Sequence, residues 1–252
     1  MHLIIFLCVA LYSAMSATVG VRLVSRALPT RGVPELLMGF AYAAAPGFGY
    51  PLVVVGSVVS DRSASALLFA LGQTGIVLGV TSFLFFNARV FRPGSRVAPV
   101  AAALGALLLA AASYHRVRTH LAVGAASLSL ASVRRDSIVT LVVLGLAYAW
   151  TALEGLRHNR MMRRRAAIGL GDPVVANRFL LWAIAGGLQC VSDVVVAFSL
   201  AQGGNMSADM LPLFATSSVG VVNSVLLVLI FMPPERYTRW LSRAPGGALA
   251  AV

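Results

Sequence analysis

Polar and small side chains recur along one face of the apolar run 179–201. They are Trp182, Gly186, Gln189 and Asp193, at intervals of four, three and four residues. This spacing places side chains on one face of an α-helix. Asp193 is the acidic residue that falls well inside an apolar run, where an ionised carboxylate must face the protein interior or water. Asp193 is therefore our principal candidate for binding an ion or a ligand.

Other polar residues fall at a similar depth in neighbouring apolar runs. Tyr50 follows Pro46, and a proline inside a helix frees a carbonyl oxygen and often kinks the helix. Together these residues predict a pocket in the outer half of a helical bundle, with Asp193 as its only charge. The alternative is that the side chains hydrogen-bond to one another and hold the helices together. The predicted ligand-binding set is Asp193, Gln189, Gln73, Tyr50, Ser217 and Asn223.

The residue types that enzymes and metal sites need are sparse. The four histidines form no metal-spaced pair, and a catalytic site needs paired acids, a histidine cluster or a nucleophile with its base. Cys8 and Cys190 lie in apolar runs, where free cysteine behaves as a small hydrophobe. The chain has no lysine, which excludes a covalent retinal Schiff base. We predict no enzyme, no metal site and no cofactor.

The composition indicates that most of the chain lies in an apolar environment. The 252 residues are 59% hydrophobic and 11% charged, whereas soluble domains carry about 25% charged residues. A helix crosses a bilayer with about 20 apolar residues. Seven such runs predict an all-α bundle of seven transmembrane helices in a single domain over 1–252, with a short tail at 233–252. The predicted spans are 3–24, 34–59, 64–86, 97–114, 138–156, 179–201 and 210–232.

The arginines predict how the chain threads through the membrane. All 20 basic residues are arginine and the net charge is +12. If the N-terminus lies outside, fifteen arginines fall on the cytoplasmic side, as the positive-inside rule requires. We predict a multi-pass protein of the plasma (inner) membrane with a cytoplasmic C-terminus. The Ala-x-Ala-like stretch 14–17 keeps a cleaved signal peptide open as an alternative. The five outer arginines are Arg62, Arg116, Arg118, Arg134 and Arg135.

A basic cluster follows the fifth predicted span. It comprises Arg160, Arg163, Arg164 and Arg165. We expect these side chains to contact anionic lipid headgroups at the cytoplasmic face, and the alternative is a docking surface for a cytoplasmic signalling partner. Nucleic-acid binding is not expected, because the arginines sit in short gaps between apolar runs rather than on a soluble basic face.

The gap 115–137 alternates between polar and apolar residues. Val117, Thr119 and Leu121 alternate with basic residues before Gly124, and a similar stretch follows. Period-two alternation around a glycine predicts a short β-hairpin over the mouth of the bundle, with an irregular or helical loop as the alternative.

Two stretches of sequence resemble known proteins. Residues 90–93 (Val-Phe-Arg-Pro) and 172–182 (Asp-Pro-Val-Val-Ala-Asn-Arg-Phe-Leu-Leu-Trp) are similar to bacterial multi-pass proteins of uncharacterised function. The resemblance implies a bacterial inner-membrane protein and carries no activity, so no functional residue is transferred. Physically, Asp172 and Pro173 predict the start of a helix.

Two classes of function fit these observations. The first is a receptor-like or sensor-like bundle, in which an outer pocket binds a small ligand and the inner loops pass the change to a partner. The second is a transporter or channel for a small solute or ion that uses Asp193. Seven helices alone imply neither function.

Overall fold

The computed structural model describes residues 2–124, 131–204 and 210–243, and all regular structure in these ranges is helical. The second span consists of three pieces, α2 (Val33–Tyr42), the π-helical η1 (Ala43–Gly49) and α3 (Tyr50–Val58). Seven spans are long and apolar enough to cross a membrane. The other elements are α1 (His2–Thr30), α4 (Arg62–Phe91), α5 (Val97–Val123), α6 (Ala131–Ala167), α7 (Pro173–Ala201), α8 (Met210–Phe231) and the short α9 (Glu235–Arg243).

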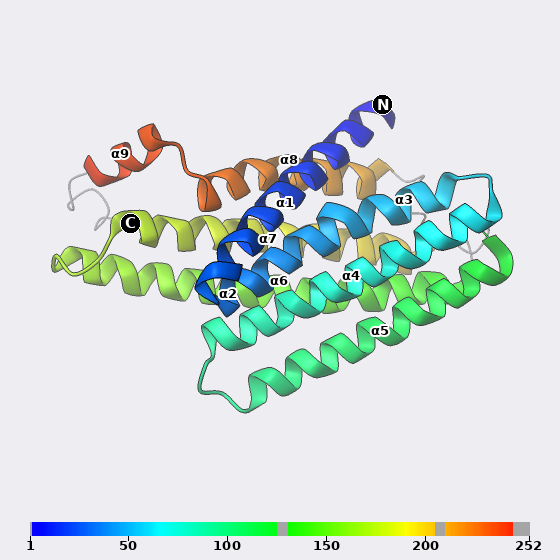
Figure 1. Cartoon of the computed structure of the whole chain (residues 1–252), viewed down its shortest axis with the longest axis horizontal. Helices are drawn as coiled ribbons and strands as arrows, with labels where there is room; N and C mark the ends of the chain where they lie inside the picture. The colour runs from blue at the N-terminus through cyan, green and yellow to red at the C-terminus, as the bar shows by residue number, and fades with distance from the viewer. Residues whose placement is uncertain (1, 125–130, 205–209, 244–252) are drawn as a thin grey trace.

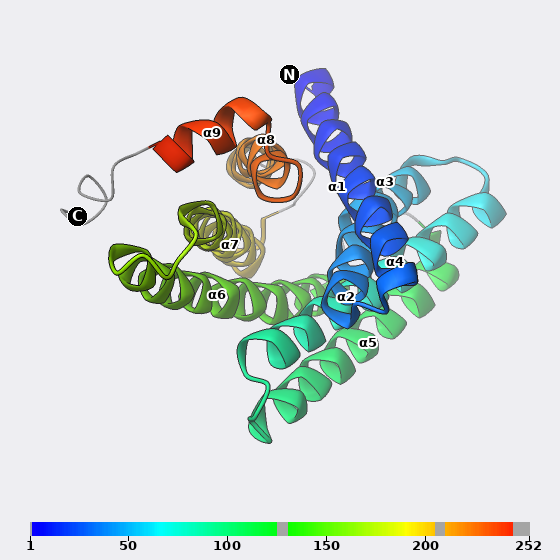
Figure 2. The same cartoon turned by 60° about the vertical axis from the view of Figure 1, so that its left-hand side comes forward.

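The spans close into a ring. α1 packs against the second span and against α8, and α4 packs against the second span and α5. α5 then contacts α6, α6 pairs with α7, and α7 returns to α8. α6, α7 and α8 run along the long axis of the molecule, while α1 to α5 are inclined to them (Figures 1 and 2). The α6–α7 turn reaches well past the α4–α5 turn (Figure 1).

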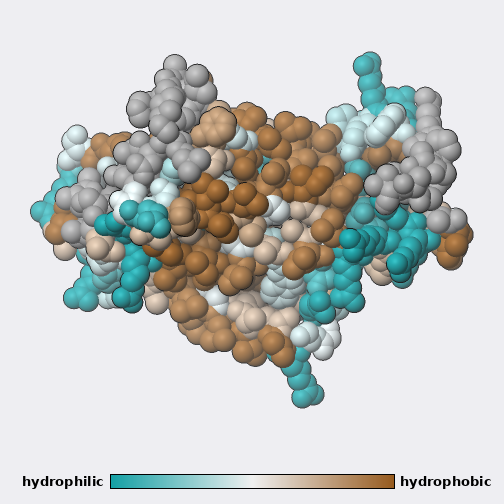
Figure 3. All heavy atoms as spheres, turned by 180° about the vertical axis from the view of Figure 1, so that it is seen from behind, coloured by the Kyte–Doolittle hydropathy of each residue, from teal (hydrophilic) through white to brown (hydrophobic). Residues whose placement is uncertain are grey.

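The surface is that of a protein embedded in lipid. Figure 3 shows an apolar band across the middle of the molecule, with hydrophilic residues gathered toward both ends. On the long apolar helices, Leu78, Leu107 and Leu146 are more than half exposed. Such exposure is unfavourable in water and favourable in hydrocarbon. The seven apolar helices and this band are those of a multi-pass membrane protein.

Pro46 lies inside η1. Proline has no N–H and its ring displaces the carbonyl of the preceding turn, and the wider π-helical turn accommodates this displacement. The chain thus continues as one span from Val33 to Val58. The irregularity expected at Pro46 is confirmed, and it takes the form of a π-helical segment.

The hairpin predicted in the gap 115–137 is wrong for its first half. α5 continues to Val123, and Gly124 ends it with a positive φ of 66°. α6 already begins at Ala131, and residues 125–130 lie outside the described part of the chain. The helix is the more stable conformation because its backbone N–H and C=O groups bond to one another within the segment. A short exposed hairpin next to lipid would leave some of these groups without partners.

α4 packs directly on the backbone of the second span. A Cβ atom added at Gly72 would lie 2.6 Å from the backbone nitrogen of Val53, and one at Gly79 would lie 2.5 Å from that of Ala45. Both distances are well below van der Waals contact. Small residues that let two helices approach closely are a common packing device in membranes.

The Gly72→Ala variant is expected to be less stable than the wild type by about 1–3 kcal/mol, because the added methyl group forces the two backbones apart. The matched control is Gly187→Ala on α7, where an added Cβ meets nothing within 4 Å in the described part of the chain. Thermal unfolding in detergent measures both. Equal melting temperatures for the two variants would show that α4 and the second span are not in close contact.

Candidate functional site

A cavity of about 250 Å³ lies inside the ring of helices. Every one of the seven spans contributes to its wall, from Tyr12 on α1 to Thr216 on α8. Its apolar wall includes Phe83 and Val80 on α4. The polar side chains that line the cavity include Tyr12, Tyr148, Arg116, Thr140, Gln189 and Asp193.

Asp193 projects into this cavity from α7, on the helix face that the sequence predicted. The side chain of Gln189 donates through Nε2 to Asp193 Oδ1 (3.1 Å), and Asn223 Nδ2 on α8 donates to Gln189 Oε1 (3.2 Å). The second carboxylate oxygen, Asp193 Oδ2, is buried and has no hydrogen-bond partner in the described part of the chain. One oxygen of Asp193 is therefore held by the protein, while the other is available to an occupant of the cavity.

Arg116 brings a second charge to the cavity, and the sequence analysis missed it. We assigned Arg116 to an outer loop, but α5 continues through it and its side chain lines the cavity wall. Its Nε is buried and has no partner in the described part of the chain. The expectation that Asp193 is the only charge in the pocket is wrong. The spacing of Ser113, Arg116 and His120, which all turn inward on one helix face, is the signal that identifies it.

The other predicted site residues divide into two groups. Tyr50 lines the cavity, and Asn223 reaches it only through Gln189. Gln73 and Ser217 are buried at the expected depth but do not line the cavity. The amide of Gln73 and the hydroxyl of Ser217 have no hydrogen-bond partners among the described residues.

A smaller cavity of about 30 Å³ adjoins the first. The two share the side chains of Tyr12, Tyr42 and Tyr148, and Asn223 and Trp182 line only the smaller one. This volume is enough for one water molecule. Polar groups therefore continue from Asp193 through Gln189 and Asn223 toward the end of the bundle where α8 ends.

An aromatic cluster seals the cavities at that end. Trp182 lies with its ring centroid 5.4 Å from that of Phe86, 6.1 Å from that of Phe91 and 6.0 Å from that of Phe231. Trp182 borders the smaller cavity, whereas Phe91 borders a groove on the far side of the cluster. The cluster therefore separates the internal cavities from the carboxyl-terminal end of the bundle.

Other buried polar groups act as interhelical contacts. Asn87 on α4 donates through Nδ2 to the carbonyl of Ala147 (3.2 Å) and accepts from Thr151 Oγ1 (3.0 Å), both on α6. Ser65 on α4 donates to the carbonyl of Gly56 (2.6 Å) and lies 3.0 Å from His120 Nε2. These hydrogen bonds hold α4 against its neighbours, and the residues that form them do not line the larger cavity.

Glu154 is also a buried acid in the described part of the chain. The predicted span 138–156 ends just after it, but α6 continues for three more turns and the side chain is buried. Its carboxylate accepts from Arg92 Nε (2.5 Å) and lies 3.8 Å from Arg157 Nη1. Glu154 therefore ties α6 to the end of α4.

Asp172 caps α7 as predicted, accepting from the backbone N–H of Val174 (2.8 Å) with Pro173 in the first turn. Within the described ranges, no group of three or more His, Cys, Asp or Glu side chains is placed to hold a metal ion.

The fold and the cavity define a multi-pass helical membrane protein with a charged internal site. Comparison with known proteins finds no family model, no curated protein and no solved structure that matches the chain. What the site does is therefore inferred from its geometry.

Proposed function

We propose that this protein is a receptor-like or sensor-like bundle that binds a small molecule in the cavity between its seven spans. The observation that carries the proposal is a pair of buried atoms, Asp193 Oδ2 and Arg116 Nε, that have no hydrogen-bond partner in the described part of the chain and belong to residues lining one cavity. Buried polar atoms without partners are rare, because each is unfavourable by about 1–3 kcal/mol or more. A ligand with complementary groups satisfies both.

The cavity suggests the chemical class of this ligand. Its volume of about 250 Å³ lies just below the usual range for ligand pockets, roughly 300–1,000 Å³, which favours a small molecule. Phe83 and Tyr148 offer apolar and aromatic contact for its body. Asp193 suits a cationic or hydrogen-donating group and Arg116 an anionic one, so a small zwitterion fits both.

A ligand screen tests the proposal. Small cations, anions and zwitterions of matched size are added to the purified protein, and thermal unfolding is measured. A ligand at a hundred times its Kd stabilises the folded protein by about 2.7 kcal/mol. We expect zwitterions or cations to raise the melting temperature. The proposal fails if no compound does so and if mass spectrometry finds no small molecule retained by the protein.

The orientation follows from the same arginines that the sequence analysis counted. We infer that the end of the bundle where α1 begins faces outward, and that the α4–α5 and α6–α7 turns and α9 face the cytoplasm of the cell whose plasma membrane holds the protein. Trp240 on α9 is exposed beside Tyr237, whose hydroxyl accepts from Asn177 Nδ2 (2.5 Å), and aromatic side chains of this kind favour the membrane interface.

Epitope tags test this orientation. A tag at the N-terminus is expected to bind antibody on intact cells, and a tag at the C-terminus only after the membrane is permeabilised. Both tags on one side of the membrane would contradict an odd number of spans, and a reversed pattern would contradict the inferred direction.

A transporter is the second candidate. The observation that favours it is the polar chain from Asp193 to Asn223, which continues beyond the larger cavity toward the cytoplasmic half. Transport would require the aromatic cluster around Trp182 to open. Uptake into proteoliposomes tests this candidate, and the absence of flux for a compound that binds would leave the receptor as the supported function.

A further inference from the structure

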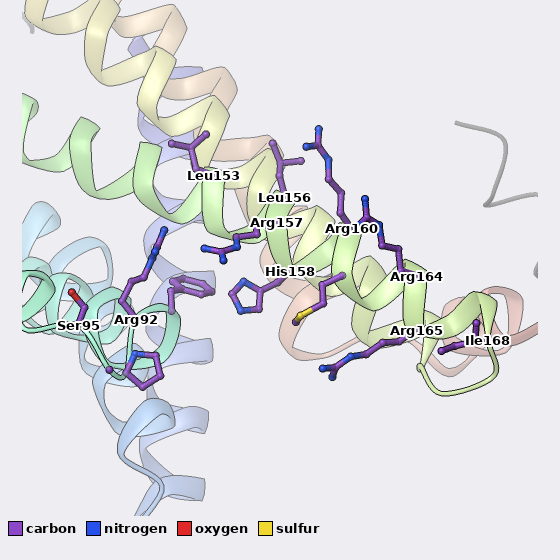
Figure 4. Close-up of a pocket in the computed structure, with 14 residues that line it drawn as sticks. Arg92, Ser95, Leu153, Leu156, Arg157, His158, Arg160, Arg164, Arg165 and Ile168 are labelled. Atoms are coloured by element: carbon purple, nitrogen blue, oxygen red, sulfur yellow. The ribbon is translucent and has the colours of Figure 1, made fainter.

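A second hollow lies at the carboxyl-terminal end of the molecule, outside the ring of helices. It is a groove of about 1100 Å³ between the α4–α5 turn and the last turns of α6. Figure 4 shows Arg157 directed toward Arg92 across the groove, with Arg160 and Arg164 projecting together from α6. The arginines that line the groove are Arg92, Arg157, Arg160, Arg164 and Arg165.

The groove carries a net positive charge. Among the described residues, Glu154 is the carboxylate that pairs with arginines of the groove, and its oxygens already face Arg92 and Arg157. Arg160, Arg164 and Arg165 form no ion pair with any described carboxylate. Three guanidinium groups are therefore free to bind an anion, and guanidinium groups bind phosphate oxygens through paired N–H donors.

Arg163, which the sequence grouped with these arginines, does not line the groove. It follows Arg160 by three residues along α6, yet only Arg160 contributes to the groove wall. The basic cluster is therefore divided by the helix into side chains that belong to the groove and one that does not. This division provides a matched control of equal charge and nearly equal position.

The groove also has an apolar wall that precedes the arginines along α6. Leu153 is 68% exposed and Leu156 is 39% exposed, and both line the groove. From Leu153 to Arg164 the helix rises about 16 Å. Figure 4 shows the leucines on the turns of α6 nearer the bundle and the arginines farther along. The order from apolar to cationic matches the order from acyl chain to headgroup in a bilayer.

We propose that this groove is a binding site for an anionic phospholipid of the cytoplasmic leaflet. Its phosphate binds Arg160 and Arg164, which project together from α6 (Figure 4), and an acyl chain lies along Leu153 and Leu156. The site is separated from the internal cavity by the aromatic cluster, so it does not depend on the function proposed for that cavity. A lipid bound there joins the α4–α5 turn to α6.

The test is retention of phospholipid by the detergent-purified protein, measured by native mass spectrometry after exchange with phosphatidylglycerol or with phosphatidylcholine. The test variant is Arg160→Gln/Arg164→Gln, and the control is Arg163→Gln/Arg178→Gln, which removes two charges outside the groove. We expect the wild type and the control to retain phosphatidylglycerol in preference to phosphatidylcholine. The test variant should bind it about thirtyfold more weakly, as expected for the loss of two arginines near a headgroup.

Three results would overturn the proposal. The first is equal loss of phosphatidylglycerol in the two variants, which would indicate a general surface charge. The second is equal retention of phosphatidylcholine and phosphatidylglycerol by the wild type. The third is displacement of the lipid by millimolar inorganic phosphate or by a phosphorylated peptide, which would assign the arginines to a soluble anion. Melting temperatures of both variants confirm that they remain folded.

Discussion

The Asp193→Asn variant is expected to bind the cavity ligand about thirtyfold more weakly than the wild type, or worse. This factor corresponds to about 2 kcal/mol, the low end of the range for removing one partner of a buried charge pair. The neutral amide keeps the size of the side chain and leaves Arg116 in place. Affinity is measured by thermal shift or calorimetry with the compound found by screening.

The fold should survive this substitution. The carbonyl oxygen of the introduced amide would still accept from Gln189 Nε2, and an isolated buried carboxylate is unfavourable in the empty protein, so the unliganded variant should be at least as stable as the wild type. Asp61→Asn serves as a control, because Asp61 caps α4 outside the cavity and asparagine caps helices equally well. Equal affinities for the Asp193→Asn and Asp61→Asn variants would remove Asp193 from the site.

The Trp182→Ala variant is expected to lose on the order of 2–4 kcal/mol of stability, because the indole is the centre of the aromatic cluster and its removal leaves a cavity among Phe86, Phe91 and Phe231. The new space would join the smaller cavity to the groove side of the cluster. Denaturation in detergent measures the first effect, and a solute leak in proteoliposomes measures the second.

Trp182→Phe is the matched variant. The indole Nε1 is buried and has no partner among the described residues, so phenylalanine keeps most of the ring contacts and loses no hydrogen bond. We expect Trp182→Phe to be about as stable as the wild type and to show no solute leak in proteoliposomes. If Trp182→Ala were as stable as the wild type and leaked no more solute, the cluster would not be the barrier between the cavities and the end of the bundle where α8 ends.

The spans were predictable from sequence because hydrocarbon imposes one strong rule, that the backbone must satisfy its own hydrogen bonds. Hydropathy therefore located all seven apolar runs. It predicted the boundaries of the lipid-embedded part of each helix, but not the ends of the helix itself. α5 extends nine residues past its predicted end at residue 114, and α6 begins seven residues before its predicted start at 138. Polar residues beyond the lipid continue these helices, and the predicted hairpin arose from treating them as a loop.

Besides Tyr50, the cavity residues that the sequence predicted lie on one helix that carried a clear pattern. Gln189 and Asp193 share a face of α7, and the helical period showed this face directly. Gln73 and Ser217 were placed at the right depth, but depth does not determine which way a side chain points around the helix axis. Arg116 was missed because its helix was ended too early.

Contacts between segments far apart in the chain could not be predicted from the sequence. Glu154 and Arg92 are separated by 62 residues and meet because α4 ends beside α6. Arg160 and Arg164 line the groove between the α4–α5 turn and α6, whereas Arg163 does not. No local pattern of charge distinguishes these three arginines.

The receptor-like function proposed for the cavity requires that small solutes reach it from the side of the membrane inferred to face outward. Ser137→Cys on the cavity wall tests it most directly, in a chain whose Cys8 and Cys190 are replaced by alanine. The account predicts that a membrane-impermeant thiol reagent added to intact cells labels this cysteine, and that it does not label Leu146→Cys, which lies on the exposed apolar surface of the same helix. Labelling of Ser137→Cys only in inside-out vesicles, or in neither preparation, would contradict the account.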